Sequence, residues 1–572
     1  MEVPATRINN MSLFAELRRR NVLKAALLYA VTSLLIVWAV DRAVSGGIAP
    51  IWAKEFILLL LAIGFPVALI FAWVYEITPQ GVKKGLEHDQ TQSIVYKTGH
   101  KLNAAVAVLG VLGVAALIGE RLLPEFEFVL PEPVEEIPLR PVYDSPLAAG
   151  VPKEITSYTL SNGLRIIVWP DHDIPNVALY NFVRAGGRNE YPGISGLSHF
   201  FEHMMFNGTD KLEPGEFDRI MEAAGGSNNA YTSNDLTVYQ NWFPRSALKT
   251  IFEIEAERLA YLEFDEDMID SERNVVYSER RSGIDNDNFG RLYEQMRATA
   301  FIAHPYRLPV IGWPSDVERW TKEDLESYFK TYYAPNNCTM VFSGAVSPGE
   351  IFLLADQYFA PIPRQKPPPP VRTIEPEQQG ERRIVVETEA QTPLLHFAFH
   401  AGTAADPETQ HMNLLLQILV GDSSSRLHRQ LVEEEQIALS VGGWQDEGFD
   451  PGIVYLHLTL PPGGDVAAVE ARVLEELERV ATEGVTGAEL SKAQNILLAD
   501  YWRGLATISG KASALGNYEV FTGSFENLFS APDEIDAVTR EQLQSVATRV
   551  FRRSNMTVGV LRAPGAVAGE SS

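Results

Sequence analysis

Three long runs of uncharged residues lie within the first 120 positions, at 25–40, 56–75 and 102–119. Each run approaches the ~20 apolar residues that a helix needs to cross a bilayer. The pattern predicts a membrane anchor over 1–120, with three transmembrane helices at about 22–44, 56–75 and 102–119. The alternative is a signal peptide followed by buried core helices, but the first run lacks a small-residue cleavage site.

Basic residues are distributed unevenly around these runs. Five precede the first run and four lysines lie in the second loop, whereas the first loop has only Arg42 and Lys54. Because cytoplasmic loops carry the excess of Lys and Arg, the tail and the second loop are predicted to lie inside. The sequence therefore predicts a multi-pass protein of a bacterial inner membrane, with everything after residue 120 on the periplasmic side.

Beyond the anchor, strand and helix patterns alternate in two halves. The predicted divisions are a Pro- and Glu-rich tether, a first half, a Pro-rich linker, a second half and a tail, at 121–153, 154–363, 364–382, 383–561 and 562–572. The sequence Val-Arg-Ala-Gly-Gly at 183–187 is answered 216 residues later by Phe-His-Ala-Gly-Thr at 399–403. This repeat predicts an α+β fold of two related α/β-sandwich halves, each a mixed or antiparallel sheet with helices, around a shared cavity.

Composition narrows the class of protein. The formal net charge of -26 opposes binding to phosphate backbones, so no nucleic-acid partner is expected. The one cysteine, Cys338, forms no intramolecular disulfide and no Cys-rich metal site. It lies in the apolar run 338–342, which is typical of a buried strand, so a nucleophilic role is disfavoured.

The candidate chemistry lies in residues 197–206, Leu-Ser-His-Phe-Phe-Glu-His-Met-Met-Phe. On a helix, His199 and His203 share one face, so two imidazoles can bind one zinc ion. Glu202 lies beside them, within reach of a metal-bound water. Catalytic zinc takes three protein ligands and keeps one position open, so a third ligand is expected from elsewhere. A motif this short also occurs by chance, and structural context decides between the two.

The order His-x-x-Glu-His resembles that of the inverzincins, and the chain is similar to the pitrilysin family of zinc metallopeptidases, in particular its processing-peptidase-like bacterial members. The family carries a second motif, Glu-Arg-x-x-Val-x-x-Glu. Residues 272–279 fit it, with 75 residues between His203 and Glu279. The resemblance implies that Glu279 is the third ligand, that Glu272 orients a ligating histidine, and that one Zn²⁺ is bound per chain.

The implied activity is that of a zinc metalloendopeptidase. Glu202 would act as the general base on a zinc-activated water and then pass the proton to the leaving amine. The half at 154–363 would be catalytic, and the half at 383–561 would be metal-free. Extended or unfolded peptides are the expected substrates, because a cavity that closes between two halves admits no folded domain.

Residues 225–232, Gly-Gly-Ser-Asn-Asn-Ala-Tyr-Thr, resemble the family's substrate-binding edge strand. Asn229 and Ala230 fall on its substrate-contact positions. Strand addition binds an extended peptide through main-chain hydrogen bonds without reading its sequence. The alternative is an ordinary Gly/Asn turn.

One segment departs from the family pattern. Active members carry an Arg and a Tyr after a Ser-Arg-Leu motif, and these steady the substrate carbonyl; here the positions are Val432 and Leu439. Loss of an oxyanion donor costs about 10²–10³ in rate. Another group could substitute, or a homodimer or a related subunit could supply the pair. The rival functions are a non-catalytic scaffold of the same fold and a small-molecule zinc hydrolase.

The second half shows no metal motif of its own. The positions equivalent to the motif are Leu415, Ile418 and Leu419. His396 and His400 are four residues apart, but their context is a strand, where they would lie about 13 Å apart and could not share an ion. Both are predicted to be structural.

Overall fold

The structure is a computed structural model that describes residues 150–263 and 265–565, two short strands before them, and six single residues. The chain divides into two compact units, Met1–Glu136 and Ile137–Ser572. The second unit contains both of the predicted halves, and its architecture is described first.

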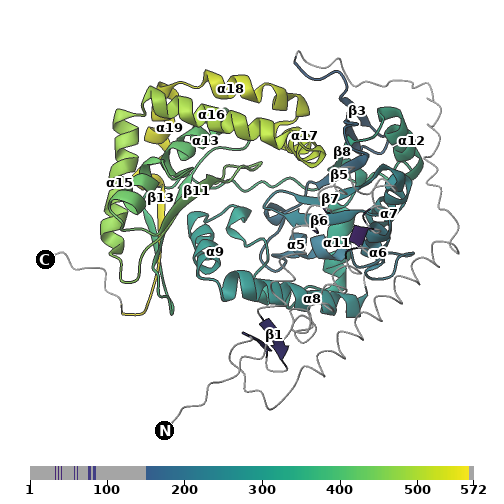
Figure 1. Cartoon of the computed structure of the whole chain (residues 1–572), viewed down its shortest axis with the longest axis horizontal. Coiled ribbons are helices and arrows are strands. Elements are labelled where there is room, and N and C mark those ends of the chain that lie inside the picture. Colours follow the sequence, from purple (N-terminus) through teal and green to yellow (C-terminus); the bar gives the residue numbers. More distant parts are fainter. Residues whose placement is uncertain are drawn as a thin grey trace, which may run out of the picture. The chain divides into compact units, whose positions relative to one another are not determined.

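Six strands of the first half form one mixed sheet (Figure 1). Their order is β3 (Thr156–Thr159), β4 (Arg165–Pro170), β8 (Cys338–Gly344), β5 (Asn176–Val183), β7 (Thr237–Pro244) and β6 (Ser227–Thr232). β4 and β8 are parallel, and the other neighbouring pairs are antiparallel. The predicted strand at 338–342 is therefore present as β8, and β6 is the edge strand.

The second half repeats this arrangement. Its sheet has the order β11 (Ser440–Gln445), β12 (Ile453–Thr459), β10 (Leu394–His400), β13 (Met556–Arg562) and β9 (Arg382–Glu387). Here too one pair, β9 and β13, is parallel and the others are antiparallel. Strand for strand this matches the first sheet without β3, so the two related halves predicted from the internal repeat are confirmed.

Helices cover the sheets on both sides. Those of the first half are α5 (Leu197–Met204), α6 (Glu216–Ala223), α7 (Leu248–Ala260), α8 (Glu266–Arg280), α9 (Asn288–Ala300), α10 (Pro314–Val317), α11 (Lys322–Tyr332) and α12 (Pro348–Tyr358). Those of the second half are α13 (Glu408–Val420), α14 (Arg426–His428), α15 (Val466–Glu483), α16 (Gly487–Gly504), α17 (Ile508–Thr522), α18 (Ala531–Ala537) and α19 (Arg540–Val550).

One helix of each half packs on the sheet of the other half: α17 on the first sheet and α9 on the second (Figure 1). Strand β5 is buried on both faces, and its residues Ala178 and Phe182 pack with Leu515 of α17. Conversely, Met296 of α9 packs with Leu561 of β13. The boundaries at 154–363 and 383–561 stay a prediction, because packing crosses them in both directions.

Gly516 of α17 lies where that helix meets the first sheet. A Cβ at Gly516 would stand 1.9 Å from the buried Phe182 ring, whereas a Cβ at Gly504 of α16 would meet nothing within 4 Å. Overpacking a core costs about 1–3 kcal/mol. We expect Gly516→Ala to lower the free energy of unfolding by this amount in chemical denaturation. Gly504→Ala is the matched control, and it should be neutral or stabilising by up to ~1 kcal/mol; equal effects would contradict the packing.

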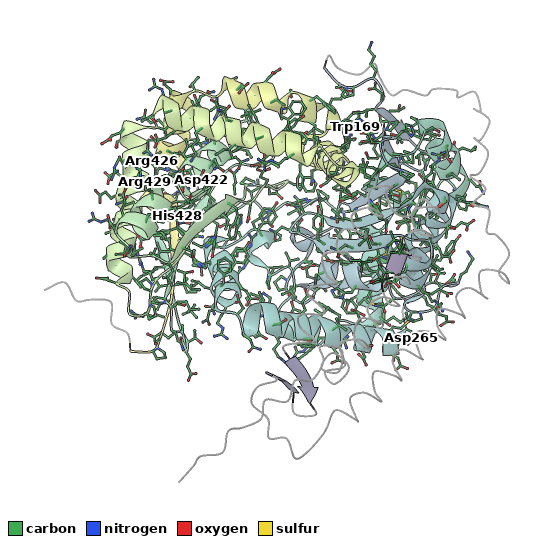
Figure 2. The ribbon with its side chains drawn as sticks, viewed as in Figure 1. Trp169, Asp265, Asp422, Arg426, His428 and Arg429 are labelled. Carbon is green, nitrogen blue, oxygen red and sulfur yellow. The ribbon has the colours of Figure 1, made fainter. Side chains whose placement is uncertain are left out.

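Polar and aromatic contacts also join the halves. The Arg188 guanidinium pairs with Asp450 of the second half and with Asp235, at 3.2 Å, of the first. The Tyr306 hydroxyl donates to Asp235 at 2.8 Å. Trp169, which is labelled in Figure 2, lies near the end of β4. Its ring contacts that of Phe529, with centroids 5.6 Å apart. The contact with Asp450 holds the loop between β11 and β12 against the first half, and the contact with Phe529 does the same for the segment after α17.

The predicted membrane spans fall mainly on residues outside those that the structure describes. The described single residues in this region are helical: Ser33, Ile36, Val37, Val40, Ile57 and Leu61. A hairpin of β1 (Tyr75–Thr78) and β2 (Gly81–Lys84) begins at the last residue of the second run. Among the described residues, no helix has both the length and the apolar character to cross a membrane. The anchor over 1–120 stays a prediction.

Candidate metal centre

Helix α5 carries the His-x-x-Glu-His motif. Its residues Phe200, Phe201 and Met204 are fully buried in the core of the first half, which fixes the rotation of the helix. His199 and His203, one turn apart, therefore point from the same face, with ring centroids 4.8 Å apart. The helix predicted from the sequence is confirmed in type and position.

Helix α8 carries the second motif. Glu272 and Glu279 are two turns apart and share one face. Asp265, which is labelled in Figure 2, lies at the start of the helix. Its carboxylate accepts first-turn N–H groups at 2.7 and 3.3 Å. Ile269 and Val276, seven residues apart, are buried and anchor the helix in the core. The packing of α8 against α5 then brings both glutamates to the histidines.

The three predicted ligands converge on one point. Oε2 of Glu279 lies 3.4 Å from Nε2 of His199 and 3.5 Å from Nε2 of His203. All three ligand atoms lie within 4.8 Å of one another. Two ligands of a tetrahedral zinc ion, each ~2.0–2.1 Å from it, stand about 3.3–3.4 Å apart. The donor set and its spacing therefore fit zinc, and the Glu279 side chain, 49% exposed, leaves the site open toward solvent.

A carboxylate behind His203 fixes its orientation. Nδ1 of His203 lies 2.7 Å from Oε1 of Glu272, whose Oε2 accepts from the Asn207 side chain at 2.8 Å. Burial works against protonation of His203, but Glu272 and Glu279 outweigh it and raise the pKa of His203 to about 9. Hydrogen bonds from the histidines lower the pKa of Glu279, and the one to His203 lowers that of Glu272. With Nδ1 held by Glu272, Nε2 is directed to the metal.

The proton on His203 competes with zinc, which gives a pH dependence. Below pH 9 each ion bound displaces this proton, so the apparent affinity for zinc should rise about tenfold per pH unit between pH 6 and 8. Competition titration of the zinc-free chain with a chromophoric chelator measures this slope. Glu272→Gln removes a group that raises the pKa, so its slope should flatten at a lower pH. An affinity independent of pH in the unsubstituted chain would contradict the expectation.

The N-terminus of α5 is held by close backbone packing. Gly196 has φ 86°, and a Cβ there would stand 2.6 Å from Gly312, so only glycine fits. The buried Glu190 carboxylate accepts the N–H groups of Gly196 and Ser198, both at 2.7 Å, and burial raises the pKa of Glu190 to about 8. Arg280, next to Glu279, donates to the Gly312 carbonyl at 2.9 Å. The end of α8 is thereby tied to the start of α5.

Glu202 lies between the metal group and the edge strand β6. Its Oε2 accepts a hydrogen bond from the Thr232 hydroxyl at 2.7 Å. Asn229 and Ala230 are on β6, which forms a regular antiparallel ladder with β7 over Ser227–Thr232, so this segment is a strand and not a Gly/Asn turn. The outer edge of β6 is the place where an extended chain can add to the sheet.

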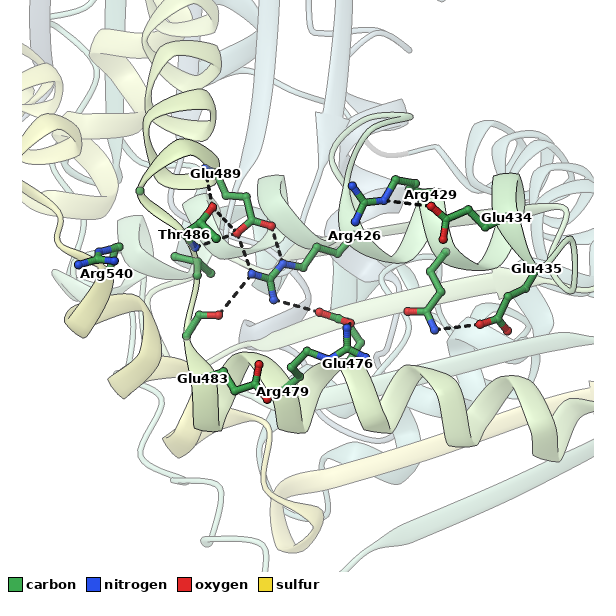
Figure 3. Close-up of a pocket in the computed structure, with 14 residues that line it drawn as sticks. Arg426, Arg429, Glu434, Glu435, Glu476, Arg479, Glu483, Thr486, Glu489 and Arg540 are labelled. Carbon is green, nitrogen blue, oxygen red and sulfur yellow. Dashed lines mark hydrogen bonds and ion pairs between the residues drawn. The ribbon is translucent and has the colours of Figure 1, made fainter.

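At the two positions where the family resemblance implies an Arg and a Tyr, the second half has apolar side chains instead. Val432 packs against the apolar core of that half, and Leu439 is 54% exposed. Arg426, just before them, is bound to Glu476 and Glu489 in a charged cavity of about 720 Å³ (Figure 3). Arg426 therefore holds the segment before Val432 and Leu439 in place. Neither of these two residues offers a polar side chain.

Other residues of the second half that the sequence singled out lie in its core or in its sheet. Leu415, Ile418 and Leu419, at the positions equivalent to the motif, are core residues of α13. His396 and His400 are on strand β10 as predicted. Within residues 150–263 and 265–565, the group on α5 and α8 is the one set of three candidate ligands that the structure brings together.

Sequence reasoning did not assign roles to three residues that support the site. Asn207 lies four residues after His203, a spacing that could have drawn attention to it. Thr232 ends the segment that resembles a substrate-binding strand, but nothing local indicates its contact with Glu202. Glu190 has no signal, because its acceptor role depends on how the loop before α5 folds back.

A two-half α+β fold with a His-His-Glu group and a glutamate beside it defines a zinc metallopeptidase. Comparisons with known proteins support this class. The protein-family model described as "Insulinase (Peptidase family M16)" matches residues 166–312 of this chain, and the one described as "Peptidase M16 inactive domain" matches residues 319–497. The first match contains all three candidate ligands.

Similar proteins cover both halves. The zinc protease PqqE of Helicobacter pylori is 30% identical over 414 residues, 71% of this chain and 92% of that protein. A probable mitochondrial-processing peptidase subunit beta from Schizosaccharomyces pombe is 24% identical over 429 residues, 72% and 92% of the two chains. The crystal structure of a protease from Helicobacter pylori has a TM-score of 0.69 at 27% identity, covering 71% and 99%. The chain belongs to peptidase family M16 and is a zinc metallopeptidase.

Proposed function

We propose that the chain is a membrane-anchored endopeptidase that hydrolyses extended or unfolded peptides at the centre between α5 and α8. The observation that carries the proposal is the convergence of His199, His203 and Glu279 beside Glu202. His199, His203 and Glu279 would hold one Zn²⁺ per chain. A zinc ion bound there supplies Lewis acidity, which polarises a carbonyl and lowers the pKa of water to ~7.

The residues around the metal site have separate roles in the reaction. Glu202 accepts a proton from the attacking water and delivers it to the leaving amine. Glu272 keeps His203 in the tautomer that presents Nε2. The outer edge of β6, the strand that carries Asn229 and Ala230, offers main-chain groups to the peptide, which would bind as an added strand. An extended backbone is needed for such pairing, which is the physical reason to expect unfolded substrates.

The test uses one polypeptide in two states. The full-length chain is incubated with an unstructured peptide and with the same sequence inside a folded domain, and the products are identified by mass spectrometry. We expect cleavage of the unstructured form alone, its loss with a chelator and its recovery with zinc. Equal cleavage of both forms would contradict the substrate class, and faster hydrolysis of simple esters would favour a small-molecule hydrolase.

A partner is part of the proposal, because Val432 and Leu439 leave the second half without hydrogen-bond donors at two positions. The chain would act as a homodimer, or with a related subunit that supplies an Arg/Tyr pair. Light scattering and co-purification from membranes test this. Zinc bound without Glu202-dependent cleavage by the purified chain, and cleavage on addition of the co-purified subunit, would support the heterodimer. No cleavage in either case would favour the scaffold function.

The anchor over 1–120 and a periplasmic position of both halves complete the proposal, on the uncharged runs and the Lys and Arg distribution. Carbonate extraction of bacterial membranes should leave the chain in the pellet. Protease added to spheroplasts should degrade the two halves. Release into the carbonate supernatant would contradict the anchor, and protection in intact spheroplasts would contradict the orientation.

A further inference from the structure

We propose that Thr232 is a positioning residue for the reaction: its hydroxyl holds the Glu202 carboxylate so that one oxygen faces the water that is to be deprotonated. The inference rests on the proposed function of Glu202 as the base. Nothing in the motifs assigns a role to Thr232, and the contact is made by a strand and a helix that are 30 residues apart along the chain.

The contact has the character of a charge-assisted hydrogen bond. The hydroxyl oxygen of Thr232 stands 2.7 Å from Oε2 of Glu202, in the range of O–H donors to carboxylates. An ionised carboxylate only accepts, so the proton belongs to Thr232. Among the described residues, Thr232 is the one side chain that donates to Glu202. The bond holds Oε2 and with it the orientation of the carboxylate, so that Oε1 can face the substrate water.

The neighbouring threonine directs this proton. Thr237 pairs with Thr232 across β6 and β7, with the two hydroxyl oxygens 3.4 Å apart. The Thr237 hydroxyl is committed as a donor to the Ala185 carbonyl at 3.0 Å. Each hydroxyl has one proton, so Thr237 has none for Thr232 and Thr232 can give its own to Glu202.

The backbone around Thr232 is also held in place. The turn after β6 is bound to the loop at Gly187 and Arg188 through their N–H groups, which donate to the carbonyls of Ser233 and Asn234 at 3.2 and 2.7 Å. Thr232 ends the edge strand that would pair with the peptide. One strand therefore carries both the groups that would bind the substrate backbone and the hydroxyl that orients the base.

The test compares Thr232→Val, which keeps the β-branched shape, with Thr232→Ser, which keeps the hydroxyl. A misplacement of a reacting group by ~1 Å costs about 10²-fold in rate, so we expect Thr232→Val to lower kcat about 10–100-fold. KM and zinc content should be unchanged, and Thr232→Ser should restore most of kcat. In a Glu202→Gln background, Thr232→Val should cause no further loss.

Crystal structures of the zinc-free full chain and both variants give a readout independent of activity. Glu202 should leave its position in Thr232→Val and keep it in Thr232→Ser. Thr209→Val, which loses a buried hydroxyl that contacts Glu257 and not Glu202, is the control, and it should lower the melting temperature rather than kcat. An unmoved Glu202 in Thr232→Val, or a change in KM alone, would overturn the inference.

If Thr232→Val does not fold, the Ser variant and Thr232→Ala replace it. Equal activity of the unsubstituted chain and Glu202→Gln would instead refute the proposed function, while the position of Glu202 in the crystals still decides the inference.

Discussion

Glu202→Gln is expected to lower kcat for peptide hydrolysis by about 10²–10⁴-fold, the contribution that a positioned general base makes to such reactions. Glutamine has nearly the shape of glutamate and can still accept from the Thr232 hydroxyl, but its amide cannot take up a proton. Glu202 is not one of the three converging ligands, so zinc content should stay at that of the unsubstituted chain. Initial rates with an unstructured peptide and metal analysis of the same samples measure both quantities.

A matched substitution separates chemistry from charge. Glu222 is an exposed carboxylate on the neighbouring helix α6, and Glu222→Gln removes the same charge without touching the metal group. It should leave kcat and KM unchanged. A Glu202→Gln variant with normal kcat, at full zinc occupancy, would show that another group serves as the base.

Glu279→Gln is expected to abolish stable zinc binding and, with it, detectable hydrolysis. Its Oε2 lies within 3.5 Å of both imidazole nitrogens, so its loss removes one of three ligands and the charge that offsets the ion. The loss of affinity should exceed the about 10–100-fold expected for Glu272→Gln, which removes only the partner of a ligand. Competition titration with a chromophoric chelator ranks the two variants.

The control for this prediction lies on the same helix. Glu266 is exposed in the first turn of α8, at the opposite end of the helix from Glu279. Glu266→Gln should therefore retain zinc. Circular dichroism of all variants tests whether α8 is intact, because Glu279 is half exposed and its substitution leaves the core untouched. Retention of one zinc per chain by Glu279→Gln would remove this residue from the set of ligands.

Part of the candidate site could be predicted from local sequence patterns. His199 and His203 could be found from the sequence because a spacing of four places two side chains on one face of any helix. Glu279 is separated from His203 by 75 residues, and only resemblance to a family indicated it. Thr232 meets Glu202 because β6 lies beside α5, a neighbourhood that the alternation of β6 alone does not specify.

The fold, too, could be predicted only in part from sequence patterns. The repeat at Val183 and Phe399 predicted two similar halves, and strands of the two sheets follow in the same order. The exchange of α9 and α17 was not predicted. Their apolar positions indicate that one face is buried, but Phe182 and Gly516 fit each other only through shape, which a hydrophobic pattern does not encode.

By itself the sequence determined the strand that carries Cys338, the strand that carries His396 and His400, and the pair of imidazoles on α5, because these depend on periodicity within a few residues. Tertiary structure alone decided that α8 brings Glu279 to those imidazoles, that β6 brings Thr232 to Glu202, and that each sheet is covered by a helix of the other half. Such choices are made by complementary packing between distant segments, where many helices present equally apolar faces and only one fits.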